Sequence, residues 1–106
     1  MNKLKHQGDV VFIPVDKMPS GKTIKHNGSD VLALGETTGH KHLITVARPD
    51  QMIITILDGN KFINLLSPAV VTHEEHGDIA LAPGIYRIGA EREVDYFSMT
   101  TRNVID

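Results

Sequence analysis

Residues 52–66 have the sequence MIITILDGNKFINLL, in which two β-prone runs flank Asp58-Gly59-Asn60. Isoleucine, threonine and phenylalanine suit the pleated surface of a strand, and a short Asp/Gly/Asn connection is a strong local signal for a β-hairpin. Both faces of the two runs carry apolar side chains. We therefore predict a hairpin that lies in the centre of its sheet or at a contact between subunits.

The register of this hairpin depends on which two residues form the turn. A Gly59-Asn60 turn sets Asp58 opposite Lys61 and pairs polar with polar and apolar with apolar residues along the strands, as cross-strand energetics prefer. The alternative Asp58-Gly59 turn sets Ile56 against Lys61. The pairing of like with like favours the first register.

The rest of the chain carries the same kind of pattern. Further strands are expected at residues 8–15, 22–26, 30–35, 40–46, 69–75, 78–82 and 85–88, separated by Gly, Pro, Asn and Asp turn signals. No stretch longer than two turns shows the 3.6-residue apolar period of a helix. The sequence therefore predicts an all-β fold, a small single-domain antiparallel barrel or sandwich over residues 1–106, with residues 94–106 as a loosely packed tail.

Composition limits the classes of function. With 106 residues, 41% of them hydrophobic, the chain can form one hydrophobic core that does not need a metal ion or a disulfide for its stability. The absence of cysteine excludes disulfides and thiolate metal sites. The net charge of −2 is spread along the chain, which disfavours a nucleic-acid module. No apolar stretch is long enough for a signal peptide or a membrane span, so a cytoplasmic protein without membrane contact is expected.

Four of the six histidines lie in two short segments, GHKH at residues 39–42 and HEEH at residues 73–76. Side chains alternate along a strand, so His40 and His42 share a face, which apolar Ile44 continues. We therefore expect this pair of histidines to point inward, toward a pocket or barrel mouth.

Paired histidines beside carboxylates suit a divalent transition metal such as Zn, Ni, Fe or Mn. The predicted ligands are His40, His42 and His73, with His76 or Glu75 as the fourth. The alternative is that these histidines lie on the surface or in loops and make only hydrogen bonds.

The second segment raises a question of geometry. Strand alternation puts His73 and Glu75 on one face and His76 on the other, unless Gly77 permits a bend that swings His76 back. Glu74 and Glu75 are the candidate catalytic residues. A carboxylate there can act as a ligand, as an acceptor that fixes a histidine tautomer, or as a general base; a solvated strand end is the alternative.

Two segments resemble cupins, small β-barrels that often hold a divalent metal inside through His-x-His and later ligands. Residues 40–42 match that first motif, but residues 43–47 lack the glutamate that the family places there. Residues 77–84, GDIALAPG, resemble the second motif, with Arg87 where the family has histidine and one residue fewer before Gly84. The resemblance implies a cupin-like barrel, which we favour over a sandwich.

A second resemblance covers nearly the whole chain. Residues 6–10 (HQGDV), 35–42 (GETTGHKH), 73–76 (HEEH) and 83–86 (PGIY) are similar to segments of small uncharacterised bacterial and phage-associated proteins. This resemblance implies that the segments act as a unit, and it does not indicate which reaction, if any, the protein catalyses.

The sequence thus favours a small soluble all-β protein that binds a divalent metal through a histidine cluster. Whether it is an enzyme is open; metal-assisted hydrolysis, isomerisation or oxygen chemistry on a small-molecule ligand is the natural class. The alternative is a structural or assembly module, phage-type or homo-oligomeric, whose histidines only make hydrogen bonds. A third reading is a binding module switched by histidine protonation. A homo-oligomer is expected in any case.

Overall fold

The computed structural model describes residues 4–8, 10–32, 41–74 and 76–90. These residues form ten strands and one short 3-10 helix, η1 (Pro49–Gln51). The strands are β1 (Lys5–Gln7), β2 (Val10–Pro14), β3 (Lys22–Ile24), β4 (Ser29–Val31), β5 (Leu43–Val46), β6 (Met52–Leu57), β7 (Asn60–Leu65), β8 (Ala69–Thr72), β9 (Ile79–Leu81) and β10 (Gly84–Ala90).

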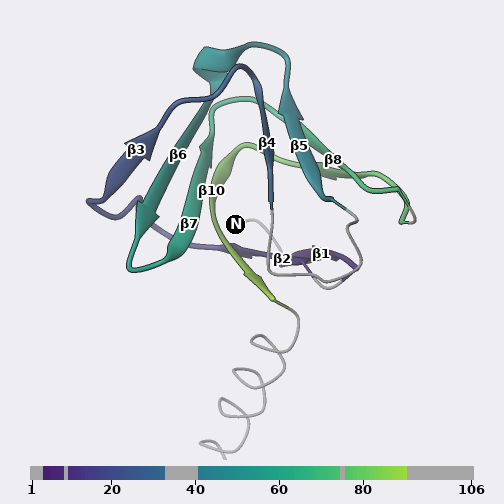
Figure 1. Cartoon of the computed structure of the whole chain (residues 1–106), viewed down its shortest axis with the longest axis horizontal. Coiled ribbons are helices and arrows are strands. Elements are labelled where there is room, and N and C mark those ends of the chain that lie inside the picture. The colour runs from purple at the N-terminus through teal and green to yellow at the C-terminus, as the bar shows by residue number, and fades with distance from the viewer. Residues whose placement is uncertain (1–3, 9, 33–40, 75, 91–106) are drawn as a thin grey trace, which may run out of the picture.

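The strands form two antiparallel sheets. The larger has the order β1-β2-β10-β7-β6-β3 and the smaller the order β4-β5-β8-β9. The sheets meet where β5 passes through η1 into β6, and they spread apart toward the other end of the molecule (Figure 1). The predicted all-β antiparallel fold is confirmed. In the described part of the chain no backbone ladder joins the two sheets into a closed barrel, so the favoured cupin-like barrel is not confirmed.

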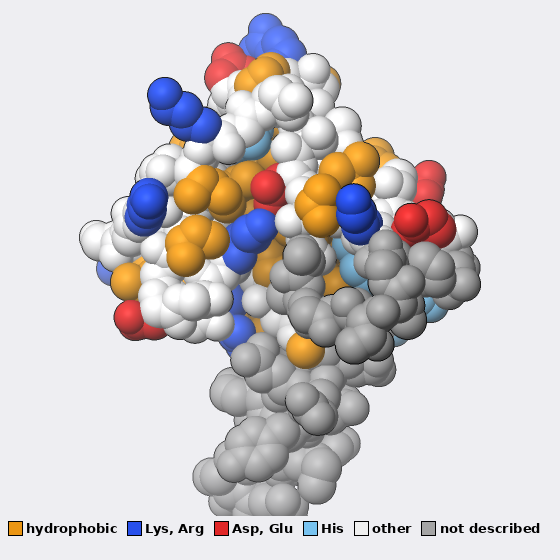
Figure 2. Space-filling model, viewed as in Figure 1, with side chains coloured by type: hydrophobic (Ala, Val, Ile, Leu, Met, Phe, Trp, Pro, Cys, Tyr) orange, Lys and Arg blue, Asp and Glu red, His pale blue; other side chains and the backbone are white. Residues whose placement is uncertain are grey.

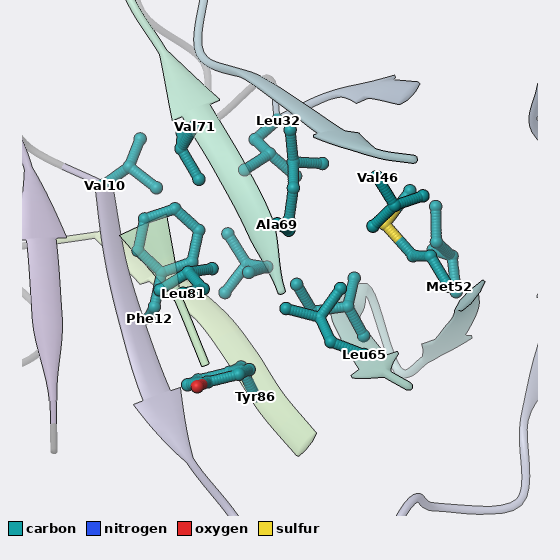
Figure 3. Packing of buried hydrophobic residues seen from close by; sticks show 14 residues of the cluster. Val10, Phe12, Leu32, Val46, Met52, Leu65, Ala69, Val71, Leu81 and Tyr86 are labelled. Carbon is teal, nitrogen blue, oxygen red and sulfur yellow. The ribbon is translucent and has the colours of Figure 1, made fainter. Parts of the chain in front are cut away.

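The core fills the space between the sheets. Phe12 and Tyr86 from the larger sheet point toward Val71 and Leu81 from the smaller one, and all four are at most 1% exposed (Figure 3). Alternating residues of β5, β7 and β8 contribute to this layer, as expected for two packed sheets. Burial of these large side chains stabilises the packing of the two sheets.

The central hairpin has the register that the sequence did not favour. Ile56 pairs with Lys61 and Leu57 with Asn60, so Asp58-Gly59 forms the turn. Both turn residues have positive φ, 53° and 78°, which is the type I′ geometry that suits the twist of a hairpin. The predicted Gly59-Asn60 turn is wrong because turn geometry outweighs the matching of polar partners.

Burial shows which face of the hairpin points to the core. Ile54 lies opposite Ile63 on the core side, both fully buried, whereas Ile53 and Leu66 lie on the outside, 40% and 53% exposed. The two candidate registers differ by two residues and keep the same side chains on each face, so the turn distinguishes them and burial does not. The prediction that the hairpin is central is confirmed, since β6 and β7 lie between β3 and β10.

Side chains connect the two sheets. Lys5 on β1 donates from Nζ to the carbonyl oxygen of Ala80 on β9 at 2.7 Å, and this contact joins an edge strand of each sheet. Elsewhere, Lys61 of β7, a strand inside the larger sheet, forms a hydrogen-bonded ion pair with Asp30 of β4. Figure 2 shows hydrophobic side chains on both sides of a hollow, with acidic and basic side chains between them. Both contacts join strands that no backbone ladder connects in the described part of the chain.

Most expected strands are present with shorter bounds. The short strand predicted at residues 22–26 is β3, at the edge of the larger sheet. β1 carries no strong strand pattern and was not predicted; it pairs with β2, with Gln7 opposite Val10. The predicted tail at residues 94–106 lies outside the described residues. Within those residues, no helix is long and apolar enough to cross a membrane.

Candidate functional site

The pairing of β5 with β8 brings two of the predicted histidines together. Leu43 is opposite Thr72, and one step further along the same register His42 faces His73. The two imidazole centroids are 4.3 Å apart. His42 is 3% exposed and follows the buried face of Ile44, so the predicted inward orientation is confirmed for His42.

His76 joins this pair from the segment after β8. Its ring centroid is 4.6 Å from that of His73 and 6.5 Å from that of His42, and its ring lies nearly parallel to His42, at 11°. The chain therefore brings His76, which is exposed, back beside the rings of His73 and His42. We call His42, His73 and His76 the histidine cluster.

The turn after β1 lies against the histidine cluster. Gly8 has a φ of +60°, and a Cβ at this position would lie 2.7 Å from Nε2 of His76 and 3.4 Å from Cε1 of His42. Because 2.7 Å is shorter than contacts that Cβ atoms make, only glycine fits here without movement of His76.

Gln7 makes three hydrogen bonds beside the cluster. Its Nε2 donates to the carbonyl oxygens of Val71 at 2.9 Å and Gly77 at 2.8 Å. Its Oε1 lies 2.9 Å from Nδ1 of His42. Gln7, like His42, is only 3% exposed. The side chain thus connects the edge strand of the larger sheet with β8, the segment after it and the imidazole of His42.

Glu74, a candidate catalytic residue, lies on the other face of the smaller sheet. Its Oε1 accepts a hydrogen bond from the backbone N–H of Lys41 at 3.0 Å. Both residues line an open pocket of about 330 Å³, together with Val31, Leu43, Thr72 and His73. His73 is therefore a member of the histidine cluster that also lines this pocket.

His6 and His26 lie apart from the cluster. His6 is exposed on β1. His26 shares a hydrogen bond between Nε2 and the carbonyl oxygen of Met52, and its Nδ1 accepts from the N–H of Gly28 at 3.0 Å. Since the amide donates to Nδ1, Nε2 of His26 carries the proton that Met52 accepts. His26 thus supports the chain around β3 and β6.

Tyr86 is a titratable residue of the core. The hydroxyl of Tyr86 donates to the carbonyl oxygen of Ala82 at 2.7 Å, and burial raises the pKa of this phenol above its ordinary value of 10.0. Tyr86 therefore packs in the core as a neutral phenol.

Of the five predicted metal ligands, the structure brings His42, His73 and His76 together, whereas His40 and Glu75 lie outside the described residues. Among the residues that are described, no set of three or more His, Asp or Glu side chains is arranged to hold a metal ion. Gln7 and Gly8 carry no ligand signal in the sequence, because glutamine and glycine are not typical ligands. The resemblance that includes HQGDV at residues 6–10 is the signal that points to them.

Comparison with known proteins supplies a family and no activity. No curated protein and no solved structure matches the chain significantly. Residues 6–91 match the family described as Domain of unknown function (DUF8820). This segment contains both histidine segments, Gln7 and Gly8. Since the match covers most of the 106 residues, the chain belongs to the DUF8820 family.

Proposed function

We propose that the protein binds a divalent transition-metal ion through the histidine cluster. The observation that carries this proposal is the approach of three imidazoles from two chain segments, with centroid separations of 4.3, 4.6 and 6.5 Å. Neutral imidazole is the commonest protein ligand for such ions. Three protein ligands with an open fourth position are also the usual arrangement of a catalytic zinc site.

The observed centroid distances lie on both sides of the distance expected for imidazoles that bind one ion. With metal–nitrogen distances of about 2.0–2.1 Å, two imidazoles on one ion hold their centroids roughly 5 Å apart. His73 is somewhat too close to each neighbour, and His42 and His76 are too far apart. Metal binding therefore requires the rings of His73 and His76 to turn about their side-chain torsions while Gln7 holds His42. It requires no change in the pairing of the strands.

The ligand type suggests an order of affinities. A site of imidazoles without thiolate suits Ni and Zn, and the general order of divalent ions puts Fe and Mn below them. His40 and Glu75 remain predicted additional ligands. Glu74 and Glu75 remain candidates for a general base, since a metal-bound water needs a nearby proton acceptor if the protein is an enzyme. Glu74 could serve only a water on the side of the open pocket, where its Oε1 accepts from the N–H of Lys41.

The test is metal binding by protein purified without a histidine tag, measured by elemental analysis and by competition with a chromophoric chelator. We expect one ion per chain in the wild type and at least a 100-fold loss of affinity in His73→Gln, with folding checked by circular dichroism. The matched control is His6→Gln, which removes an exposed imidazole outside the cluster and should bind normally. Failure of the wild type to bind Zn, Ni, Fe or Mn would reject the proposal, as would an equal loss in His6→Gln.

Self-association through the outer face of the smaller sheet is the second candidate, in line with a structural or assembly module. Val31 and Val70 are exposed on this face, where Leu43 pairs with Val31. A stable dimer needs a contact above roughly 1,000 Å², more than these side chains supply alone. Light scattering on the wild type and on Val70→Lys tests it: a wild-type dimer that Val70→Lys dissociates supports the candidate, and a wild-type monomer at high concentration excludes it.

A further inference from the structure

The amide of Gln7 has only one orientation that satisfies its neighbours. Its nitrogen lies within hydrogen-bond distance of two carbonyl oxygens, those of Val71 and Gly77. An amide nitrogen has two hydrogens to donate, and a carbonyl oxygen can only accept. Turning the amide over would set Oε1 against both carbonyl oxygens and leave all three without a donor. The two carbonyls therefore fix the orientation of the side chain.

This orientation determines the proton on His42. Oε1 of Gln7 lies 2.9 Å from Nδ1 of His42, and an amide oxygen can only accept, so Nδ1 carries the hydrogen. In the neutral imidazole the lone pair is then on Nε2. Both side chains are 3% exposed, so water competes little for this bond.

We propose that Gln7 is a positioning residue of the histidine cluster, which holds His42 as the Nδ1-protonated tautomer with Nε2 as its ligand nitrogen. The tautomer follows from hydrogen bonding alone, and the role of Nε2 as a ligand rests on the proposed metal-binding function. A group that accepts from the second nitrogen of a liganding histidine fixes its tautomer and ring orientation, and its loss typically lowers metal affinity 10- to 100-fold.

The position of Gln7 explains why this residue and no neighbour can do so. Gln7 lies on β1, the edge strand of the larger sheet, while Val71 is on β8 and Gly77 follows His76. Its side chain therefore holds His42 and the segment that carries His73 and His76 at one point. Lys5, two residues earlier on the same strand, makes a similar connection to Ala80. Its hydrogen bond goes to a backbone carbonyl oxygen and not to an imidazole, so Lys5 serves as a matched control.

The first measurement needs no variant. Long-range ¹H–¹⁵N NMR of metal-free protein, at a pH where histidine is neutral, distinguishes a protonated from an unprotonated nitrogen in each ring. We expect His42 to show a protonated Nδ1 and an unprotonated Nε2. The opposite tautomer in the wild type would overturn the inference, whatever the variants do.

The variants test whether Gln7 causes the effect. Gln7→Met removes the acceptor, so His42 should shift toward the Nε2-protonated tautomer and metal affinity should fall about 10- to 100-fold. Gln7→Glu keeps an acceptor for Nδ1 and should keep the wild-type tautomer. It should also lower stability, because its second oxygen faces the carbonyl oxygens of Val71 and Gly77. Lys5→Met removes the neighbouring connection between the sheets and should leave the tautomer and the affinity unchanged. An equal loss of affinity in Lys5→Met and Gln7→Met would show that Gln7 acts only through the fold, and would overturn the inference.

The two proposals fail in different ways. Wild-type protein with the expected His42 tautomer and no affinity for any of the four metals rejects the proposed function and the ligand role of Nε2, and leaves Gln7 as the group that sets the tautomer. Wild-type protein that binds metal, with Gln7→Met binding equally well, rejects the positioning role and leaves the metal site.

Discussion

Gly8 and His76 approach each other so closely that a Cβ on Gly8 would lie 2.7 Å from Nε2 of His76. The turn between β1 and β2 and the segment after β8 therefore fit together only because residue 8 has no side chain. This packing is part of the histidine cluster, since the same Cβ would lie 3.4 Å from His42.

Gly8→Ala should destabilise the protein and disturb the cluster together. The left-handed φ of +60° costs about 1–2 kcal/mol for a residue with a Cβ, and His76 must rotate away. Denaturant unfolding should show this loss, and metal affinity should fall with it. Gly77→Ala is the control, because its Cβ would meet nothing within 4 Å. Equal behaviour of the two variants would contradict this account of Gly8.

Breaking the ion pair between Lys61 and Asp30 should weaken the connection between the sheets. The side chains are 22% and 18% exposed, so the pair is partly buried. Its contribution to stability should be larger than that of an exposed pair, under about 1 kcal/mol, and smaller than the cost of disrupting a buried pair, about 3–5 kcal/mol. We expect Lys61→Met and Asp30→Asn each to cost about 1–2 kcal/mol in urea unfolding. A double-mutant cycle without coupling energy would show that the pair contributes nothing.

The turn of the central hairpin can be tested with two valine substitutions. Asp58 has a φ of 53°, so Asp58→Val should cost about 1–2 kcal/mol, since β-branched residues avoid this region. Asn60 is the first residue of β7, and Asn60→Val should change stability by less than about 0.5 kcal/mol. With a Gly59-Asn60 turn, residue 58 would be a strand residue that tolerates valine. A cost of Asp58→Val no larger than that of Asn60→Val would therefore contradict the observed turn.

Alkaline pH should destabilise the protein through Tyr86. Burial raises the pKa of the Tyr86 phenol in the folded state, so the folded chain holds this proton more tightly than the unfolded chain does. The resulting stabilisation is complete below about pH 10 and is lost as the pH rises through the folded-state pKa.

Unfolding measured from about pH 8 to pH 11 should therefore show a decline that Tyr86→Phe reduces. This variant also loses the hydrogen bond to Ala82, at a cost of about 1 kcal/mol at neutral pH. Tyr96→Phe removes the other tyrosine and should keep the alkaline decline. A decline that persists unchanged in Tyr86→Phe would assign it to another group.

Local patterns predicted the elements better than their arrangement. Turn signals and β-branched runs indicated most strands, and alternation from His42 to Ile44 predicted the buried face. The prediction of the hairpin register was wrong because it gave side-chain pairing more weight than turn geometry. The positive φ angles of Asp58 and Gly59 determine the turn. The relation of the two sheets depends on contacts between distant edges, such as that of Lys5 with Ala80, which no local period reveals.

The candidate site was predictable only in part for the same reason. Histidine spacing pointed to His42, His73 and His76, whereas the return of His76 depended on a bend near Gly77 that alternation alone does not predict. Gln7 acts through the orientation of its amide toward His42, and Gly8 through the absence of a side chain beside His76. Both effects depend on tertiary packing, which the local sequence does not show.

The hydrogen bonds of Gln7 close loops of 35, 64 and 70 residues, to His42, Val71 and Gly77 respectively. Contacts this distant in sequence form slowly, because the entropy of loop closure must be lost before they stabilise anything. A nascent chain cannot complete the cluster until residue 77 has left the ribosome and β1 has reached β8. If the cluster binds a metal ion as proposed, occupancy of the site would therefore report that the two ends of this 70-residue loop have come together.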